Sequence, residues 1–165
     1  MTAFLSKEHL QRYQDEGAVL VKGVVGEEWL QVLRSVVQKA KDENSKFSYE
    51  HSTESGRFFE DQFLWKRYEE AKDFVFKGPL ARLAGMVMQS KKVNLFYDHI
   101  ISKDPGTSAK TPWHNDMSYY QLQGDQASVF DVVSPGPSGS GLLRSVLEWI
   151  SQTPHSTPSD QLCRC

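Results

Sequence analysis

Cysteine is scarce in this chain of 165 residues, and its two cysteines, Cys163 and Cys165, stand at the C-terminal end. The body of the chain therefore has no disulfide framework, and we expect a reducing, intracellular compartment, most simply the cytoplasm. Long hydrophobic runs are lacking, which argues against a membrane-spanning segment. The first residues lack the pattern of a signal peptide, and the final Gln-Leu-Cys-Arg-Cys is not a peroxisomal signal.

An excess of charge of either sign is also missing. The chain has 19 basic and 21 acidic residues, for a formal net charge of -2, and 39% of its residues are hydrophobic. This balance is typical of an ordinary globular protein and predicts neither nucleic-acid binding nor membrane binding. The length suits one domain with one substantial core, and it leaves the oligomeric state open.

Charge becomes rare after Gln126. Four of the seven prolines, with many serines and glycines, lie in this stretch, and its charged residues are Asp131, Arg144, Glu148, Asp160 and Arg164. We therefore divide the chain into a domain at 1–133 and a divergent, partly disordered tail at 134–165. Apolar residues within 142–150 have the spacing of one amphipathic helix.

The N-terminal half is dominated by helical signals. Residues 6–16 form a predicted helix with Ser6 as N-cap and Gly17 as C-terminal stop. A second helix is predicted over 27–41, with a buried stripe consisting of Trp29, Leu33, Val36, Val37 and Ala40. A third begins near Pro79. Residues 18–22 read as a short strand, and 44–70 as a packed loop followed by a helix.

A period of two replaces the helical pattern from Val93 onward. Residues 93–101 alternate between two partly apolar faces, which predicts a strand covered on both sides. Asp104 to Thr107 then form a turn, and a further strand follows. Helices followed by strands predict an α+β fold, with N-terminal helices packed on a strand-built core.

The pattern with chemical meaning is Trp113-His114-Asn-Asp116. Side chains at i and i+2 of a strand point to the same face, so the imidazole of His114 and the carboxylate of Asp116 converge. Together with a later histidine, such a pair forms the facial triad of non-haem Fe(II) oxygenases. The three-residue pattern also fits a polar pair that caps a strand end. A zinc hydrolase is a further alternative, but it lacks the ligand count and spacing.

Two longer stretches carry a family resemblance. They are Val93-Asn-Leu-Phe-Tyr-Asp-His-Ile-Ile-Ser-Lys-Asp-Pro-Gly-Thr107 and Thr111-Pro-Trp-His-Asn-Asp-Met-Ser-Tyr-Tyr120. Both resemble the phytanoyl-CoA dioxygenase family, in which a strand ending in Lys and a Pro-Gly turn precedes Trp-His-x-Asp. The opening Asp15-Glu-Gly-Ala-Val-Leu-Val-Lys-Gly23 is similar as well. The resemblance covers about residues 3–133 and is strongest over 91–126.

The resemblance implies a double-stranded β-helix (jelly-roll) dioxygenase. Such enzymes hydroxylate an unactivated carbon of a small-molecule substrate with Fe(II), 2-oxoglutarate and oxygen, and ascorbate serves as reductant in assays. It implies that His114 and Asp116 are metal ligands and that Lys103 contacts the cosubstrate carboxylate; for Lys103, a solvated lysine at a strand end is the alternative. Trp113 is expected to pack around the site. His99 is expected to be a hydrogen-bonded core histidine rather than a ligand.

The downstream part of the family pattern is missing. The family has a second histidine in a Gly-Ser-His context and then an arginine that binds 2-oxoglutarate. After Asp116 this chain has one histidine, His155, in a Pro/Ser-rich setting, and Arg164 follows it. The strands expected between are lacking, so the jelly roll is predicted to be incomplete and the chain truncated. We therefore expect weak Fe(II) binding and no turnover of 2-oxoglutarate; the alternative is a non-catalytic isoform that acts through protein contacts.

Overall fold

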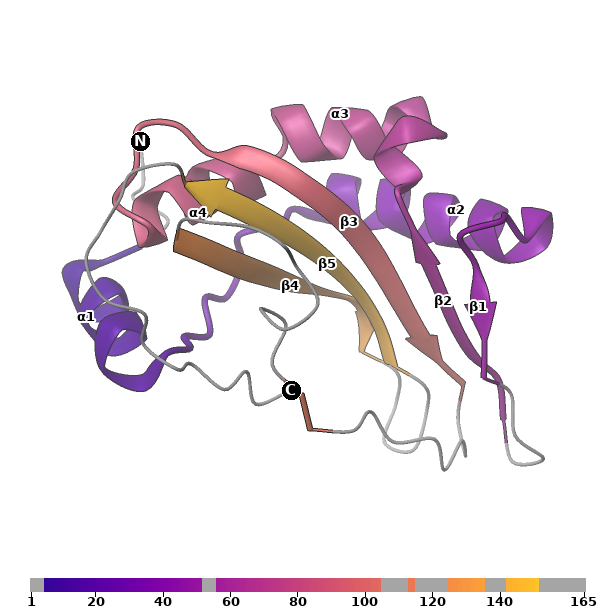
Figure 1. The fold of residues 1–165 in the computed structure, drawn as a ribbon, viewed down its shortest axis with the longest axis horizontal. Helices are drawn as coiled ribbons and strands as arrows, with labels where there is room; N and C mark the ends of the chain where they lie inside the picture. Colours follow the sequence, from indigo (N-terminus) through magenta and orange to yellow (C-terminus); the bar gives the residue numbers. More distant parts are fainter. Residues whose placement is uncertain (1–4, 52–55, 105–112, 115–124, 136–141, 152–165) are drawn as a thin grey trace.

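The computed structural model describes residues 5–51, 56–104, 113–114, 125–135 and 142–151. Within these ranges, helices and one antiparallel sheet combine in an α+β arrangement, so the predicted fold class is confirmed. Figure 1 shows the sheet as a curved layer with helices along one of its faces. The described strands form a single sheet, and the second sheet of a jelly roll stays a prediction.

Helix α1 (Lys7–Glu16) begins and ends at the predicted caps. The Ser6 hydroxyl accepts a hydrogen bond from the backbone N–H of His9 at 3.2 Å, and the His9 ring accepts one from the Ser6 N–H. At the other end Gly17 adopts a φ of 75°, and its N–H donates to the Tyr13 carbonyl at 2.8 Å. Glycine takes this left-handed conformation without a steric penalty, which is why the helix stops there.

Helix α2 (Glu27–Glu43) presents the predicted apolar stripe to the core. Its buried residues are Leu33, Val36, Val37 and Ala40. Trp29 is partly buried, and its ring centroid lies 5.5 Å from that of Phe74. The helix ends at Asn44, which has a φ of 47°. The prediction from apolar periodicity is therefore confirmed.

Two shorter helices follow a single 3-10 turn. The turn is η1 (Leu64–Lys66), and the helices are α3 (Glu69–Lys77) and α4 (Leu80–Val87). Pro79 precedes α4 directly, as predicted. The buried residues of the two helices are Ala71, Phe74, Val75, Leu80, Leu83 and Ala84. Their apolar faces explain why both helices lie against the sheet.

The sheet has the order β1-β2-β3-β5-β4, and every described pairing is antiparallel. Its strands are β1 (Tyr49–Glu50), β2 (Phe58–Gln62), β3 (Asn94–Lys103), β4 (Asp125–Pro135) and β5 (Leu142–Ser151). Strand β3 confirms the period-two pattern, with a register shift between Leu95 and Tyr97. It pairs Lys103 with Phe58 and His99 with Gln62 of β2.

The expected helix over 142–150 is wrong, because these residues form strand β5 between β3 and β4. A short apolar run fits either element, and its place in the sheet is decided by partners that lie far away in the sequence. The expected strand at 18–22 is also wrong: no strand is assigned there, and Leu20 is 74% exposed. Within 44–70, strands β1 and β2 were not predicted.

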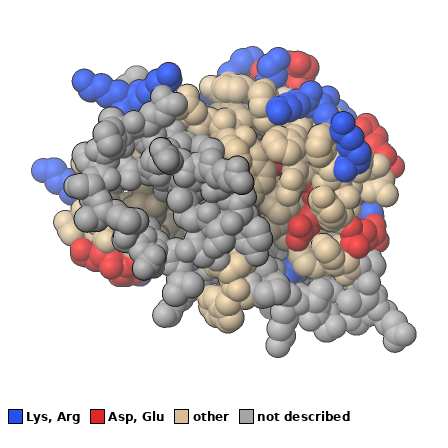
Figure 2. Space-filling model, in the orientation of Figure 1, with Lys and Arg blue, Asp and Glu red and all other residues tan. Residues whose placement is uncertain are grey.

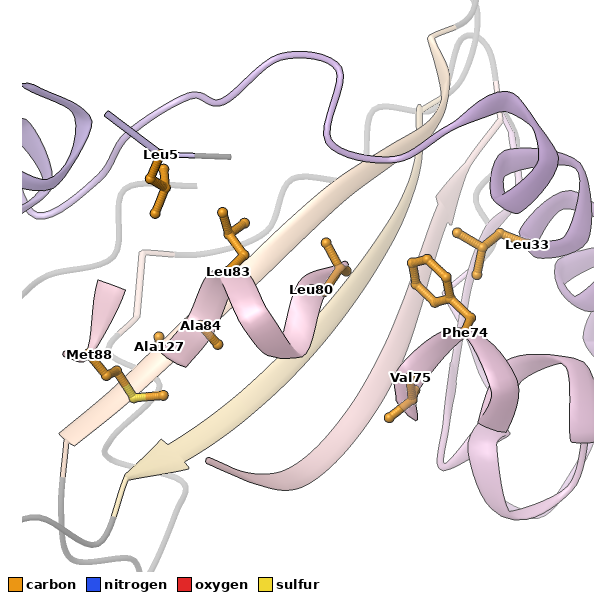
Figure 3. Close-up of a cluster of buried hydrophobic side chains, with 9 residues drawn as sticks. All are labelled: Leu5, Leu33, Phe74, Val75, Leu80, Leu83, Ala84, Met88 and Ala127. Atoms are coloured by element: carbon orange, nitrogen blue, oxygen red, sulfur yellow. The ribbon is translucent and has the colours of Figure 1, made fainter. Parts of the chain in front are cut away.

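The core lies between the helices and the sheet in two clusters. Figure 3 shows the first, where Phe74 of α3 points toward Leu33 of α2 and the α4 side chains lie over the strand that carries Ala127. The second cluster comprises Val36, Val37, Ala40, Phe59, Leu64, Tyr68, Ala71 and Ile100. Among the described residues, no helix is both long and apolar enough to cross a membrane.

Candidate active site

Strand β3 divides its side chains between two faces of the sheet. Asp98 and Ile100 line a small cavity of about 20 Å³ beneath α2 and α3, so they face the helices. Because side chains alternate along a strand, Tyr97, His99 and Lys103 belong to the opposite face. We call this face, turned away from the helices, the distal face. It carries Lys103, the residue expected at the cosubstrate.

Lys103 lies half-buried at the end of β3. Its Nζ is 4.5 Å from the ring centroid of Phe58, its register partner on β2. A ring face attracts a cation, so Phe58 helps to hold the ammonium over the sheet instead of leaving it fully in solvent. This position suits a cation that contacts a carboxylate. A lysine at a strand end adopts the same position when its stem packs on an aromatic ring.

His99 and Glu60 form a pair beside this lysine. The His99 Nε2 is 3.4 Å from a Glu60 carboxylate oxygen, and the two side chains are 13% and 22% exposed. Burial acts to raise the pKa of Glu60, but the neighbouring His99, His51 and Lys103 outweigh it, and the pKa lies below its ordinary value. The His99 ring also stacks on Tyr97, with centroids 6.0 Å apart. His99 is therefore largely buried and lies against a carboxylate.

The predicted metal ligands are described only in part. His114 is half-buried, and no strand is assigned to it or to Trp113. Trp113 is 75% exposed, and its expected packing around the site stays a prediction. Asp116, His155 and Arg164 lie outside the described residues.

The donor atoms in the described ranges do not complete a metal site by themselves. Within those ranges, no group of three or more His, Cys, Asp or Glu side chains is arranged to hold a metal ion. Of the predicted ligands, His114 alone falls in that part of the chain. An imidazole with one carboxylate two positions later is a donor pair that suits Fe(II), so the residue types fit the expected metal.

Two buried carboxylates on the helix side were not singled out by the sequence analysis. Asp61 is fully buried, and its Oδ2 accepts a hydrogen bond from Arg67 Nη2 at 2.6 Å. Asp98 is 5% exposed, and burial raises its pKa to about 6 against the opposing effect of backbone hydrogen bonds and Arg67. The signal available for Asp98 was a carboxylate in the middle of a strand that is predicted to be covered on both sides.

Comparison with known proteins gives one match. The model of a protein family described as Phytanoyl-CoA dioxygenase (PhyH) matches residues 13–134. No curated protein and no solved structure matches the chain. The matched range includes Lys103, His114 and Asp116, and it ends before His155.

Proposed function

Because the chain belongs to the phytanoyl-CoA dioxygenase family, we propose that it is built as an Fe(II)/2-oxoglutarate-dependent dioxygenase acting on a small molecule. The observation that carries this proposal is the position of the family match. It includes His114 and Asp116, the proposed ligands of Fe(II), and Lys103, the proposed contact of the cosubstrate. The half-buried place of Lys103 on the distal face supports its role.

The proposed residues have separate tasks. His114 supplies a neutral imidazole nitrogen, and Asp116 a carboxylate oxygen, both of which are ligands that Fe(II) accepts. The ammonium of Lys103 attracts and orients a carboxylate of 2-oxoglutarate. When bound, Fe(II) with 2-oxoglutarate and oxygen supplies the oxidising chemistry that hydroxylates an unactivated carbon. The protein contributes binding, orientation and exclusion of water.

We further propose that this chain carries only part of the site. His155 and Arg164 are the available candidates for the third ligand and the distal carboxylate contact, and both lie beyond the matched range. A jelly roll needs two sheets, so we propose that the five-stranded sheet is one wall of an incomplete double-stranded β-helix. With two ligands, Fe(II) binding is weak and 2-oxoglutarate is not turned over.

The test is an assay of the purified chain with Fe(II), ascorbate and 2-oxoglutarate. We expect no succinate above the protein-free blank, and weak Fe(II) binding that His114→Ala reduces further. His51→Ala is the matched control, because His51 is an exposed histidine outside the proposed ligand set. Succinate that His114→Ala abolishes and His51→Ala preserves would show a complete site and contradict the proposal that the site is partial. Fe(II) binding that both variants leave unchanged would contradict the ligand assignment.

A non-catalytic role through protein contacts is the second candidate. Strand β4 is outermost in the sheet order, and among the described residues it pairs only with β5. An edge strand presents backbone groups that can pair with another chain. We expect self-association that grows with concentration in light scattering, and a monomer at every accessible concentration would contradict this role.

A further inference from the structure

Four aromatic rings form a row toward the distal face, on residues that the proposed site does not use. Phe47 precedes β1, Phe63 follows β2, and Tyr97 and His99 lie on β3. Ring centroids are 5.3 Å apart between Phe47 and Phe63 and 6.0 Å apart at each of the next two steps. These spacings are those of interacting aromatic pairs, so the rings form one continuous row, the aromatic row. Phe47 and Phe63 are half-buried, whereas Tyr97 and His99 are largely buried.

Two exposed lysines border this row. The Nζ of Lys66 lies 4.7 Å from the ring centroid of Phe63, and the Nζ of Lys46 lies 5.0 Å from that of Phe47. Each ammonium is held over a ring face by the negative potential of the π system. On the face shown in Figure 2, blue and red side chains lie mostly toward the margin, and tan atoms lie between them and the grey region. The row thus combines apolar area with two positive charges.

Phe63, whose ring belongs to this row, has a strained backbone conformation. Phe63 has φ 56° and ψ 38°, a left-handed conformation that is uncommon for a bulky residue. Its N–H donates to the Asp98 carbonyl at 3.0 Å, which fixes the conformation. Strain of this kind is concentrated at ligand-binding and active sites.

We propose that the aromatic row binds an organic anion, an aromatic carboxylate. The apolar body packs against the exposed parts of Phe47 and Phe63 that the lysines leave uncovered, and the carboxylate pairs with the ammonium groups of Lys46 and Lys66. Charge complementarity selects the anion, because both lysines already stand at the edge of the rings. The opposing interpretation is that the lysines merely cover apolar surface with their stems.

The test is a calorimetric titration of the full chain in the presence of a chelator, so it does not depend on iron or on turnover. The probes are 2-naphthoate and its neutral isostere 2-naphthamide. We expect 2-naphthoate to bind more tightly, and Phe63→Leu to weaken both probes about 3–10-fold, the size of an aromatic pair contact. Phe76→Leu is the matched control, since Phe76 is 57% exposed on α3 and packs edge-on against Trp65 instead.

A variant that removes one positive charge tests the proposal even if Phe63→Leu does not fold. Lys66→Gln should weaken 2-naphthoate about 2–5-fold and leave 2-naphthamide unchanged, as expected for one exposed ion pair. Lys72→Gln is its control, because Lys72 pairs with Glu69 on α3 at 3.2 Å. Equal affinity for the two probes, or equal losses in each variant and its control, would overturn the proposal.

Discussion

The carboxylate of Asp98 accepts a hydrogen bond from the backbone N–H of Trp65 at 3.0 Å, across 33 positions of sequence. The same residue accepts a second bond through its backbone carbonyl, from the N–H of Phe63 at 3.0 Å. Together these bonds attach the turn at η1 to the middle of β3. Asp98 therefore fixes the segment that carries Phe63 relative to the strand that carries Lys103.

Asp98→Asn should change how stability depends on pH. In the folded chain burial raises the pKa of Asp98 from 3.8 to about 6, so folding favours the protonated carboxyl. The stability of the folded chain that goes with the protonated Asp98 carboxyl is fully present below pH 3.8 and is lost as the pH rises through 6. Two pKa units correspond to about 3 kcal/mol. The free energy of unfolding of Asp98→Asn, relative to wild type, should rise by roughly this amount between pH 4 and pH 7.

Urea unfolding of both proteins at the two pH values measures this difference. Asparagine keeps the shape of the side chain and an oxygen that can accept from Trp65, so the comparison isolates the charge. A stability difference that stays constant between pH 4 and pH 7 would show that Asp98 titrates alike in the folded and unfolded chains.

Asp61→Asn should destabilise the fold strongly. Asp61 is fully buried, and it holds Arg67 Nη2 at 2.6 Å and the Ser45 hydroxyl at 3.0 Å. Removing one charge of a buried pair leaves the other without compensation, which costs roughly 3 kcal/mol. The matched control is Glu16→Gln, because Glu16 pairs with Arg12 at 3.0 Å on exposed α1. We expect the control to change the unfolding free energy by less than about 0.5 kcal/mol. Equal effects in urea unfolding would contradict the buried role of Asp61.

Local signals explain which parts of the fold could be predicted. The ends of α1 depend on Ser6 and Gly17, whose preferences act over a few residues. Strand β3 could be predicted from its period of two. Strand β5 could not, because its apolar spacing also fits a helix and its state depends on pairing with β3 and β4. Such pairing is a property of the whole sheet and not of the local sequence.

The candidate site divides in a similar way. His114 and Asp116 came from a short motif and a family resemblance, and the family is confirmed while their roles stay predictions. The contact of Trp65 with Asp98 could not be predicted, because it joins segments far apart in the sequence. Buried polar pairs of this kind form only when the fold brings distant segments together, so the apolar periodicity of the sequence does not predict them.

Tyr68→Phe should remove one short, part-buried hydrogen bond together with a longer one, which the hydroxyl accepts from Arg67 Nη1 at 3.5 Å. The Tyr68 hydroxyl donates to a Glu43 carboxylate oxygen at 2.7 Å, and the ring belongs to the core beneath α2. A bond to a charged group contributes about 1.5–3 kcal/mol, and we expect a loss near the lower limit because Glu43 is exposed. Thermal and urea unfolding at pH 7 measure it. No loss would mean that water replaces the hydroxyl without cost.

The same hydroxyl gives a spectroscopic test. Burial and then the bond to Glu43 raise the pKa of Tyr68 to about 12. Folding therefore favours the protonated phenol, and the stabilisation is lost as the pH rises from 10 through 12. In an absorbance titration of the folded protein, wild type minus Tyr68→Phe should show one tyrosine ionising later than a free tyrosine. A difference signal centred near pH 10 would contradict the buried bond.

Gly78→Ser should destabilise the chain, whereas the same change at Gly26 should not. A Cβ at Gly78 would collide with the carbonyl oxygen of Phe74 and lie 3.0 Å from its ring Cδ2. The carbonyl is held in α3 and the ring is 1% exposed, so neither can move freely. Such overpacking costs roughly 1–3 kcal/mol.

Gly26 is the N-cap of α2, and an added Cβ there would meet only Glu28 side-chain atoms at 3.8 Å. It has a φ of -73° and lacks a side-chain cap, so Gly26→Ser adds a hydroxyl that can accept from the first turn and stabilises by a few tenths of a kcal/mol. Both variants gain the same atoms, but the added atoms collide at Gly78 and fit at Gly26. The unfolding midpoint should therefore fall for Gly78→Ser and rise for Gly26→Ser. If both midpoints shifted in the same direction, an added side chain would have the same effect at the start of α2 and at the end of α3. The close approach of Gly78 to Phe74 would then not limit the packing of α3.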